Sequence, residues 1–413
     1  MQFLKVKIAL VLIVAVFFLF FSNDFGLIDI EKTAIITAVA LDKGENGEYK
    51  VTAQIAVPEA TDTNTENERA QISGKGATIG SAIKNIGDTS GWFPQLCFCN
   101  LIIVGGEFAD DNIITILDYF SKTLRVQDSA LVVMAEKKAA ELLKLATPLD
   151  NISSFALQKI ILKNAGLNRD VAVADVKSFC TGYYSDSGAS YMPIIKIISQ
   201  KSENEKSSAE DNASDGGSSG NSSGGSSGGG SNDSSGGAKG DAIFNANTTA
   251  LFVKGKKVGE LDENLTLVFN ALTGDFDSTT FEVKDVDTGA EKRNYLLSVF
   301  DYSVTKNLDV TENKIKLNVA LRIFAKISDQ NGTSSDLEYA KNLPMPYSVK
   351  EKAESDFTAR ITELIRTEIA TGCDFLGVKK DLYRYHHEHY NTFADNYLEN
   401  LDYKVTVTFS GQK

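Results

Sequence analysis

The sequence predicts an α+β protein of two or three domains, in which helices pack on mixed or antiparallel sheets behind an N-terminal membrane-anchor helix. Three observations lead to this fold class. The chain opens with an uninterrupted apolar run over residues 8–21. Beyond it, period-two and period-3.6 apolar patterns alternate, with hairpins among them, which favours α+β units over a doubly wound parallel sheet. A Ser/Gly tract over residues 201–240 divides the remaining chain into two halves.

The apolar run has the features of an export signal or a membrane anchor. It contains no charged residue, Gly or Pro, while Lys5 and Lys7 precede it and Asp24 follows it. The run is shorter than the roughly 20 residues needed to cross about 30 Å of hydrocarbon, but residues 3–6 can extend it while the lysines reach the headgroups. Lysines before the run and an acid after it predict that the N-terminus lies on the inner, cytoplasmic side of the membrane and the remaining chain on the outer side.

The residues after the run favour retention of this segment. Signal cleavage requires small residues at the first and third positions before the cut, and a cut after Ser22 places Phe20 at the third. A lipoprotein needs a Cys directly after the run, and the first Cys of the chain is Cys97. We therefore expect an uncleaved signal-like anchor over residues 1–28, with a large extracytoplasmic portion.

Composition restricts the classes of function. A chain of 413 residues is long enough for two or three domains. Its net charge of −13, with no basic cluster beyond the two early lysines, argues against nucleic-acid binding. Four cysteines in so long an exported chain do not make a disulfide scaffold. Cys97 and Cys99 lie two apart in a strand-like run and are expected on one buried face, whereas a disulfide between Cys180 and Cys373 remains open.

The first half alternates strand and helix patterns. A hairpin is predicted over residues 31–58, because residues 43–47 contain Gly and Asn that can adopt positive φ. In its second strand, apolar and polar residues alternate, which predicts one buried face. A helix over residues 78–86 is expected to end at Gly87. Further strands are predicted at 70–77, 96–104, 130–135 and 191–198, and further helices at 110–124, 137–145, 151–165 and 171–183.

The tract over residues 201–240 consists almost entirely of Ser, Gly, Asn, Asp and Glu. Such a segment cannot bury enough apolar surface to offset the entropy of ordering its backbone, so it is predicted to be a disordered linker or long loop. A phosphate-binding glycine loop is the alternative, but it requires a strand before the glycines and a helix after them. This strand–loop–helix context is missing, so the linker is the favoured interpretation.

The second half again combines strands and helices. A hairpin over residues 247–261 leads into a helix over 261–272, with Asp262 as a possible N-cap. The strongest helix pattern covers residues 348–371, where Ser348 and Glu351 suggest a capping box and Gly372 a C-terminal stop. Strands are predicted at 279–286, 295–304, 314–327 and 402–409, and a last helix at 381–397.

The sequence offers no positive reason to expect an enzyme. All three histidines, His386, His387 and His389, lie together, and a helix would place the first and last on one face. They do not form an HExxH motif, and a solvated helix face is the favoured interpretation over a metal site. Asp29, Glu31 and Asp42 are expected to be solvated. With no GxSxG, Walker or Rossmann motif either, no catalytic residue, metal or cofactor is predicted.

Six segments, taken in order, resemble the Ger(x)C proteins, which are the C subunits of nutrient germinant receptors in bacterial spores. An Ile-Glu pair precedes a first strand that ends in Asp-Lys, a second alternating strand follows, and a Gly-x-Thr-Ile-x-x-Ala-Ile helix start comes next. The closest match is the segment TALFVKGKKVGELD, which resembles the opening of the family's C-terminal domain, and CDFLGV is similar to its Asp-x-Leu-Gly segment. The six segments are residues 29–44, 49–57, 74–86, 98–109, 249–262 and 373–378.

The resemblance implies a non-enzymatic receptor subunit on the outer face of the inner spore membrane. It would assemble with a multispanning A subunit and a permease-like B subunit and act in spore germination. The family is usually lipidated at a Cys after the signal, which this chain lacks, and a Trp usually precedes the Ile-Glu pair where this chain has Leu27-Ile28-Asp29. The expected organisation is an anchor (1–28), an N-terminal α+β region (29–200), a linker (201–240) and a C-terminal α+β domain (241–413).

Two other functions compete with the receptor subunit. The first is an anchored extracytoplasmic protein that binds a small ligand on its own, which an anchor followed by two α+β halves would also fit. Direct binding of a small molecule by this chain is therefore left open. The second is a cell-surface hydrolase with an unrecognised site, for which the histidine cluster is the single motif that can be named.

Overall fold

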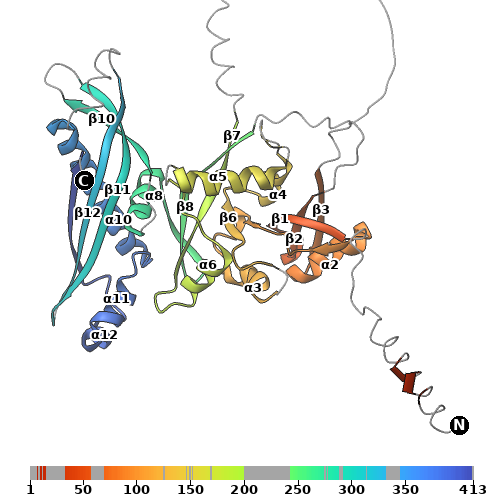
Figure 1. Ribbon diagram of the computed structural model, residues 1–413. Helices are drawn as coiled ribbons and strands as arrows, with labels where there is room; N and C mark the ends of the chain where they lie inside the picture. Colours follow the sequence, from red (N-terminus) through yellow and green to blue (C-terminus); the bar gives the residue numbers. More distant parts are fainter. Residues whose placement is uncertain are drawn as a thin grey trace, which may run out of the picture.

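The computed structural model describes most of the two halves of the chain (Figure 1). The described residues are 7, just before the apolar run, 10, 11, 13 and 14 within it, and then 33–56, 69–123, 126–145, 147, 150, 152–167, 170–199, 242–273, 276, 278–287, 292–312, 314–331 and 345–411. Among them, no helix is long and apolar enough to span a membrane. Apart from the positions just given, the anchor over 1–28 and the linker over 201–240 lie outside the described residues, and both stay predictions.

A nine-stranded mixed sheet organises the larger part of the molecule. Its strands are β1 (Thr33–Lys43), β2 (Tyr49–Ala56), β3 (Arg69–Gly76), β4 (Phe93–Gln95), β5 (Leu101–Val104), β6 (Leu131–Ala135), β7 (Ala189–Ser199), β8 (Ala242–Val253) and β9 (Lys256–Leu261). The order is β3-β2-β1-β5-β6-β7-β8-β9, and β4 pairs with the start of β1. The central strands β1, β5, β6 and β7 are parallel, whereas both ends of the sheet are antiparallel.

Helices cover both faces of this first sheet (Figure 1). One face packs against α2 (Ile79–Ser90), α3 (Ile114–Lys122) and α6 (Val176–Tyr183), and the other against α4 (Ala139–Lys144) and α5 (Ser153–Leu167). Each face has its own hydrophobic core. Within β5, Ile102 lies in the core beside α2, α3 and α6, and its neighbour Ile103 lies in the core beside α4 and α5. The central strands are therefore apolar at nearly every position, as expected for parallel strands buried on both sides.

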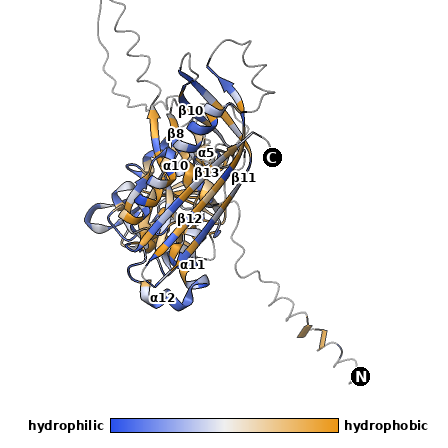
Figure 2. Ribbon diagram, turned by 90° about the vertical axis from the view of Figure 1, so that its left-hand side faces the viewer, coloured by the Kyte–Doolittle hydropathy of each residue, from blue (hydrophilic) through white to orange (hydrophobic). Residues whose placement is uncertain are grey.

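A second, four-stranded sheet consists of β10 (Thr280–Asp287), β11 (Lys292–Val310), β12 (Ile315–Gln330) and β13 (Leu401–Ser410), in that order. The last pair is parallel and the others are antiparallel. The long helix α10 (Tyr347–Thr371) packs on its inner face, and α8 (Glu263–Thr273) lies between α10 and the first sheet. Figure 2 looks toward this second sheet, whose strands alternate between hydrophilic and hydrophobic residues.

The first sheet contains strands from both sides of the Ser/Gly tract. β7 precedes the tract and β8 follows it, and the two pair antiparallel from Ala189 opposite Val253 to Ser199 opposite Ala242. The two sides of the tract are thus held together by a strand ladder. The division into domains at 29–200 and 241–413 stays a prediction, and the structure adds that β8 and β9 continue the first sheet.

Mixed α+β architecture with two sheets is confirmed, and so are several local predictions. The turn between β1 and β2 uses positive φ at Asn46 (58°) and Gly47 (79°). The Asp262 carboxylate accepts the Leu265 N–H at 2.8 Å and so caps α8. α10 ends at Gly372, whose φ of 68° lies in the left-handed region that glycine commonly adopts at the C-terminal end of a helix.

The prediction that β2 has one buried face is wrong. Thr52 and Gln54, on its polar side, are as buried as the apolar residues between them. α4 and α5 cover this side and supply polar partners, because the Gln54 amide oxygen accepts the Ser154 N–H at 2.9 Å. The solvated state expected for Asp42 is also wrong, since this residue is buried at the end of β1.

Two predictions between residues 78 and 104 need correction. α2 continues past Gly87 to Ser90 and ends at Gly91, which has a φ of 72°. The strand expected over 96–104 is limited to β5, because the preceding residues turn and the Cys99 N–H donates to the Leu96 carbonyl. Cys99 is buried in this turn, whereas Cys97 is partly exposed, so they do not share a strand face.

Three helix predictions also change. α10 begins at Tyr347 after Pro346 without a side-chain cap, so Ser348 does not form the predicted capping box. The helix expected over 381–397 is interrupted at His386 (φ −136°, ψ 46°), which separates α11 (Val378–Tyr385) from α12 (His387–Phe393). α6 covers the second part of residues 171–183, because the Asp175 carboxylate caps it by accepting the Ser178 N–H at 2.6 Å.

Candidate functional site

The two sheets meet through a continuous apolar core. Leu251 of β8 and Leu261 of β9 belong to the same core as α10 and the inner face of the second sheet. A chain of edge-on aromatic rings crosses the junction, from Tyr191 of β7 to Phe269 of α8 at 4.9 Å and on to Phe375 at 5.6 Å. This junction is therefore packed like a protein interior, and it is the setting of the most unusual polar group of the second half.

That group is Glu368, which is fully buried in the last turn of α10. Its Oε1 accepts the Leu376 N–H at 3.0 Å, and its Oε2 has no hydrogen-bond partner among the described residues. The carbonyl of Leu376 in turn accepts a hydrogen bond from the Lys306 ammonium at 3.2 Å. Glu368 and Lys306 thus hold the backbone of the segment that follows α10 from two sides.

Asp374 holds the next part of the same segment. Its two carboxylate oxygens accept the N–H groups of Val378 at 2.6 Å and Lys379 at 2.9 Å, at the start of α11. Gly377, directly before Val378, has a φ of 80°, which a residue without a Cβ adopts at the lowest cost. The Asp-x-Leu-Gly segment is therefore a device that turns the chain from α10 into α11.

Burial decides the protonation state of Glu368. Desolvation, followed by repulsion from Asp374, raises the pKa of the Glu368 carboxyl well above its ordinary value. The same two influences, burial first, raise the pKa of Tyr397 beside them. Burial therefore favours the neutral form of Glu368, beside an Asp374 side chain that accepts two backbone N–H groups. A neutral acid can both accept the Leu376 N–H and donate its own proton.

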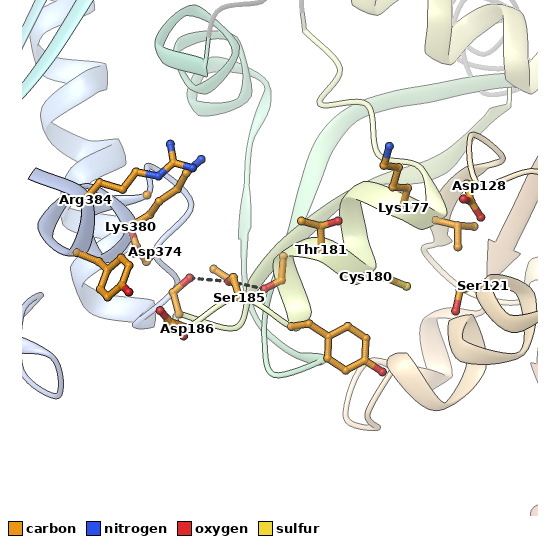
Figure 3. Close-up of a pocket in the computed structure, with 17 residues that line it drawn as sticks. Ser121, Asp128, Lys177, Cys180, Thr181, Ser185, Asp186, Asp374, Lys380 and Arg384 are labelled. Atoms are coloured by element: carbon orange, nitrogen blue, oxygen red, sulfur yellow. Dashed lines mark hydrogen bonds between the residues drawn. The ribbon is translucent and has the colours of Figure 1, made fainter.

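An open groove of about 960 Å³ lies beside this junction (Figure 3). α6 and the loop after it form one side, and residues 374–384 form the other. Figure 3 shows Lys380 and Arg384 on one side, with Ser121 and Asp128 far across the groove. Its polar side chains do not converge on one point. A pocket for a small ligand normally places a few polar groups around a common centre, so this groove lacks that feature.

A second polar site lies where the parallel strands of the first sheet end. The Asp42 carboxylate at the end of β1 accepts the N–H groups of Ala139 at 2.6 Å and Ala140 at 2.9 Å, at the start of α4. A Cβ on Gly105 at the end of β5 would lie 2.7 Å from Asp42, so glycine is needed for this approach. The carboxyl ends of parallel strands are the usual ligand position in open α/β sheets, and here a side chain of the protein fills it.

The histidines and cysteines do not assemble into a reactive centre. Tyr383 and Tyr390 pack against the His387 ring, and the helix break at His386 removes the common face expected for His386 and His389. Among the described residues, no group of three potential ligands is placed to hold a metal ion.

The cysteines of the described chain are free thiols, so the Cys180–Cys373 disulfide that the sequence left open does not form. Burial raises the pKa of the Cys99 and Cys373 thiols to about 12 and also raises that of Cys180. Protonated thiols are poor nucleophiles at neutral pH.

Comparison with known families accounts for both halves. A family model described as the spore germination protein N-terminal domain matches residues 27–197, and one described as spore germination B3/GerAC like, C-terminal, matches residues 247–410. The chain belongs to the Ger(x)C family of spore germination proteins. A solved structure titled "Crystal Structure of the GerBC protein" is similar, with a TM-score of 0.50 at 14% identity over 92% of this chain and 99% of that chain. Comparison with curated proteins gave no match.

Membership of the Ger(x)C family confirms the resemblance inferred from the ordered segments and assigns the chain a role in spore germination. At 14% identity, the similarity to GerBC concerns the fold. The structure explains two of the family-like segments physically, because Asp42 caps α4 and Asp374 caps α11. Sequence reasoning missed Glu368, although it lies four residues after Leu364 on the apolar stripe of α10. A carboxylate in that stripe was the available signal.

Proposed function

We propose that this Ger(x)C protein is the non-enzymatic C subunit of a spore nutrient germinant receptor. It is anchored by residues 1–28 and assembles with membrane-embedded A and B subunits on the outer face of the inner spore membrane. The observation that carries the proposal is the pair of family matches, which cover both halves of the chain in order. The apolar run at residues 8–21 supports the anchor.

The described polar clusters agree with a non-catalytic role. Asp42 and Asp374 accept backbone N–H groups at helix starts with both carboxylate oxygens, and Glu368 accepts one in a turn with Oε1. A catalytic acid or base needs an accessible neighbour with which to exchange a proton. These carboxyl groups instead position backbone, which is the work of a scaffold that presents surfaces to other proteins.

The test is a pull-down of the tagged full-length chain from gently solubilised membranes of dormant spores. We expect two membrane-embedded proteins, one of them permease-like, to be recovered with it and identified by mass spectrometry. Recovery of the chain alone from a membrane where it is abundant would refute the assembly. Deleting the gene should slow germination with at least one nutrient, and unchanged responses across a broad nutrient panel would contradict the proposal.

The anchored stand-alone binding protein is the competing function. The groove beside the junction favours it, since charged side chains of both signs, Lys380, Arg384 and Asp186, line it. Calorimetry of the solubilised full-length chain with the nutrients that trigger germination separates the two functions. Heat of binding without partner proteins would favour a solitary binding protein, whereas no heat together with recovered partners would favour the receptor subunit.

A further inference from the structure

The start of the first sheet carries an uncharged surface with two large exposed aromatic side chains. Residues 89–106 contain no Asp, Glu, Lys, Arg or His, in a chain whose net charge is −13. Trp92 is 48% exposed and Phe98 is 55% exposed within this stretch. We call residues 91–98 the aromatic loop. Residues 101–104 of this stretch form the buried strand β5, but residues 89–98 before it combine two exposed rings with no charge, which favours a contact surface.

This loop lies next to Thr33, where the first strand begins. β4, inside the loop, runs parallel to the start of β1, with Phe93 opposite Thr33. Residues 22–32 connect Thr33 to the apolar run in sequence. A chain of that length spans at most about 40 Å at roughly 3.3–3.6 Å per residue. If the run is held in a bilayer, the start of β1 and the aromatic loop beside it must remain within that distance of the membrane.

A groove of about 700 Å³ opens beside Trp92, between α2 and α3. Its apolar lining includes Ile83, Pro94, Leu96 and Tyr119. The charged lining residues are Lys84 and Asp88, which form an ion pair at 3.2 Å, so they contribute no net charge. The surface therefore avoids the repulsion that an acidic protein otherwise meets at an anionic lipid surface.

We infer that the aromatic loop is a membrane contact of this protein, with the rings of Trp92 and Phe98 in the interface between headgroups and acyl chains. This inference rests on the proposed anchoring of residues 1–28. A tryptophan ring is suited to that position, because its apolar body and its polar N–H match the two sides of the interface. The contact orients the first sheet with the start of β1 toward the lipid and leaves the second sheet for other partners.

Trp92 is the single tryptophan of the chain, so its fluorescence reports on this loop alone. The full-length protein is reconstituted into phosphatidylcholine vesicles with or without brominated acyl chains, and flotation establishes whether the chain is attached. We expect brominated lipid to reduce Trp92 emission roughly two-fold, because the ring lies at the depth of the first acyl carbons. Acrylamide added to the water should quench it less in vesicles than in detergent.

A matched control moves the reporter to the second half. In the double variant Trp92→Phe/Tyr347→Trp, the new ring replaces a side chain that is 75% exposed at the start of α10. We expect brominated lipid to leave the emission of this ring unchanged. Equal responses of the two reporters, or no response of Trp92 in vesicles that carry the protein, would overturn the membrane contact while leaving the anchor intact.

Two further outcomes are also decisive. Failure of the protein to float with the vesicles would refute the anchor and the contact together. Trp92 that is quenched by acrylamide in vesicles, but protected once solubilised spore membrane proteins are reconstituted with it, would identify the loop as a protein interface and so refute the lipid contact.

Discussion

The two sheets bury their side chains in different ways. In the first sheet, helices cover both faces, and successive residues of β5 enter two separate cores. In the second sheet, α10 covers one face, and along β12 buried and exposed residues alternate over nearly its whole length. The two sheets therefore place different demands on their sequences, although both consist of β-strands.

This difference indicates which surfaces can serve function. With both faces occupied, the first sheet can offer its ends and edges to partners, and the aromatic loop lies at one end. The second sheet keeps an open face, where Lys316, Arg322 and Lys326 of β12 point outward. Leu296 and Phe300 of β11 are exposed as well, and such a mixture of charged and apolar side chains suits contact with a protein.

The largest effects should come from adjacent residues of β5. Ile102→Ala and Ile103→Ala should each lower the free energy of unfolding by ~2–5 kcal/mol, since each leaves a cavity in a different core. Urea unfolding of the detergent-solubilised full-length chain, followed by Trp92 fluorescence, measures both. A small loss for either variant would show that one face of the first sheet is not closed by its helices.

In the second sheet, the same experiment on neighbours should give unequal results. Leu321→Ala should cost ~2–5 kcal/mol, because its side chain is buried against α10. Arg322→Ala should change stability by no more than about 0.5 kcal/mol, because its side chain lies on the open face. Circular dichroism during urea unfolding follows both variants. Similar losses would mean that another layer covers the outer face, and the contrast between the sheets would disappear.

The contrast also explains how much of the fold the sequence could predict. Alternation along β12 and β13 predicts a strand with one covered face, and the structure has one. In β2, Thr52 and Gln54 follow the same alternation, yet both are buried: Thr52 pairs with the Ser73 hydroxyl of β3, and Gln54 accepts the Ser154 N–H of α5. A pattern of polar residues cannot distinguish solvent from a buried partner that is 100 residues away in the sequence.

The polar clusters were less predictable for the same reason. Asp42 follows a strand in sequence, and its partners at Ala139 and Ala140 come from a helix almost a hundred residues later. Glu368 stands on an apolar stripe, which is a local sign of burial, but its partner Leu376 depends on the turn after α10. The family resemblance identified the segments that contain Asp42 and Asp374 without indicating what these carboxylates do.

Removing one buried carboxyl group from each region, Asp42 from the first and Glu368 from the second, sharpens the comparison. Asp42→Ala should cost ~1–3 kcal/mol, because two buried N–H groups at the start of α4 lose their acceptor. Asp42→Asn should cost less, since its amide oxygen can still accept one of them. Urea midpoints from Trp92 fluorescence measure both. As a control, Asp88→Ala removes an exposed carboxylate and should leave the midpoint nearly unchanged. A cost for Asp42→Ala no larger than that for Asp88→Ala would contradict the capping role.

Glu368→Gln should have the smallest effect at neutral pH, below ~1 kcal/mol, because the amide reproduces a neutral carboxyl group that accepts the Leu376 N–H. The Glu368→Gln variant is informative because it should change how the stability of the fold depends on pH. The pKa of Glu368 is raised in the folded state, so its neutral form stabilises the fold at low pH. That contribution falls as the pH rises from the ordinary glutamate pKa through the raised one, since the folded state must then ionise a buried acid.

Thermal unfolding followed by circular dichroism from about pH 5 to about pH 9 should therefore show a smaller decline for Glu368→Gln than for the parent chain. Glu368→Ala should lose stability at every pH, because the Leu376 N–H then has no acceptor. Parallel pH curves for the parent and Glu368→Gln would mean that Glu368 is ionised in the folded protein. Asp374 would then have to share the site with a second negative charge, and the neutral-acid account of the turn from α10 into α11 would fail.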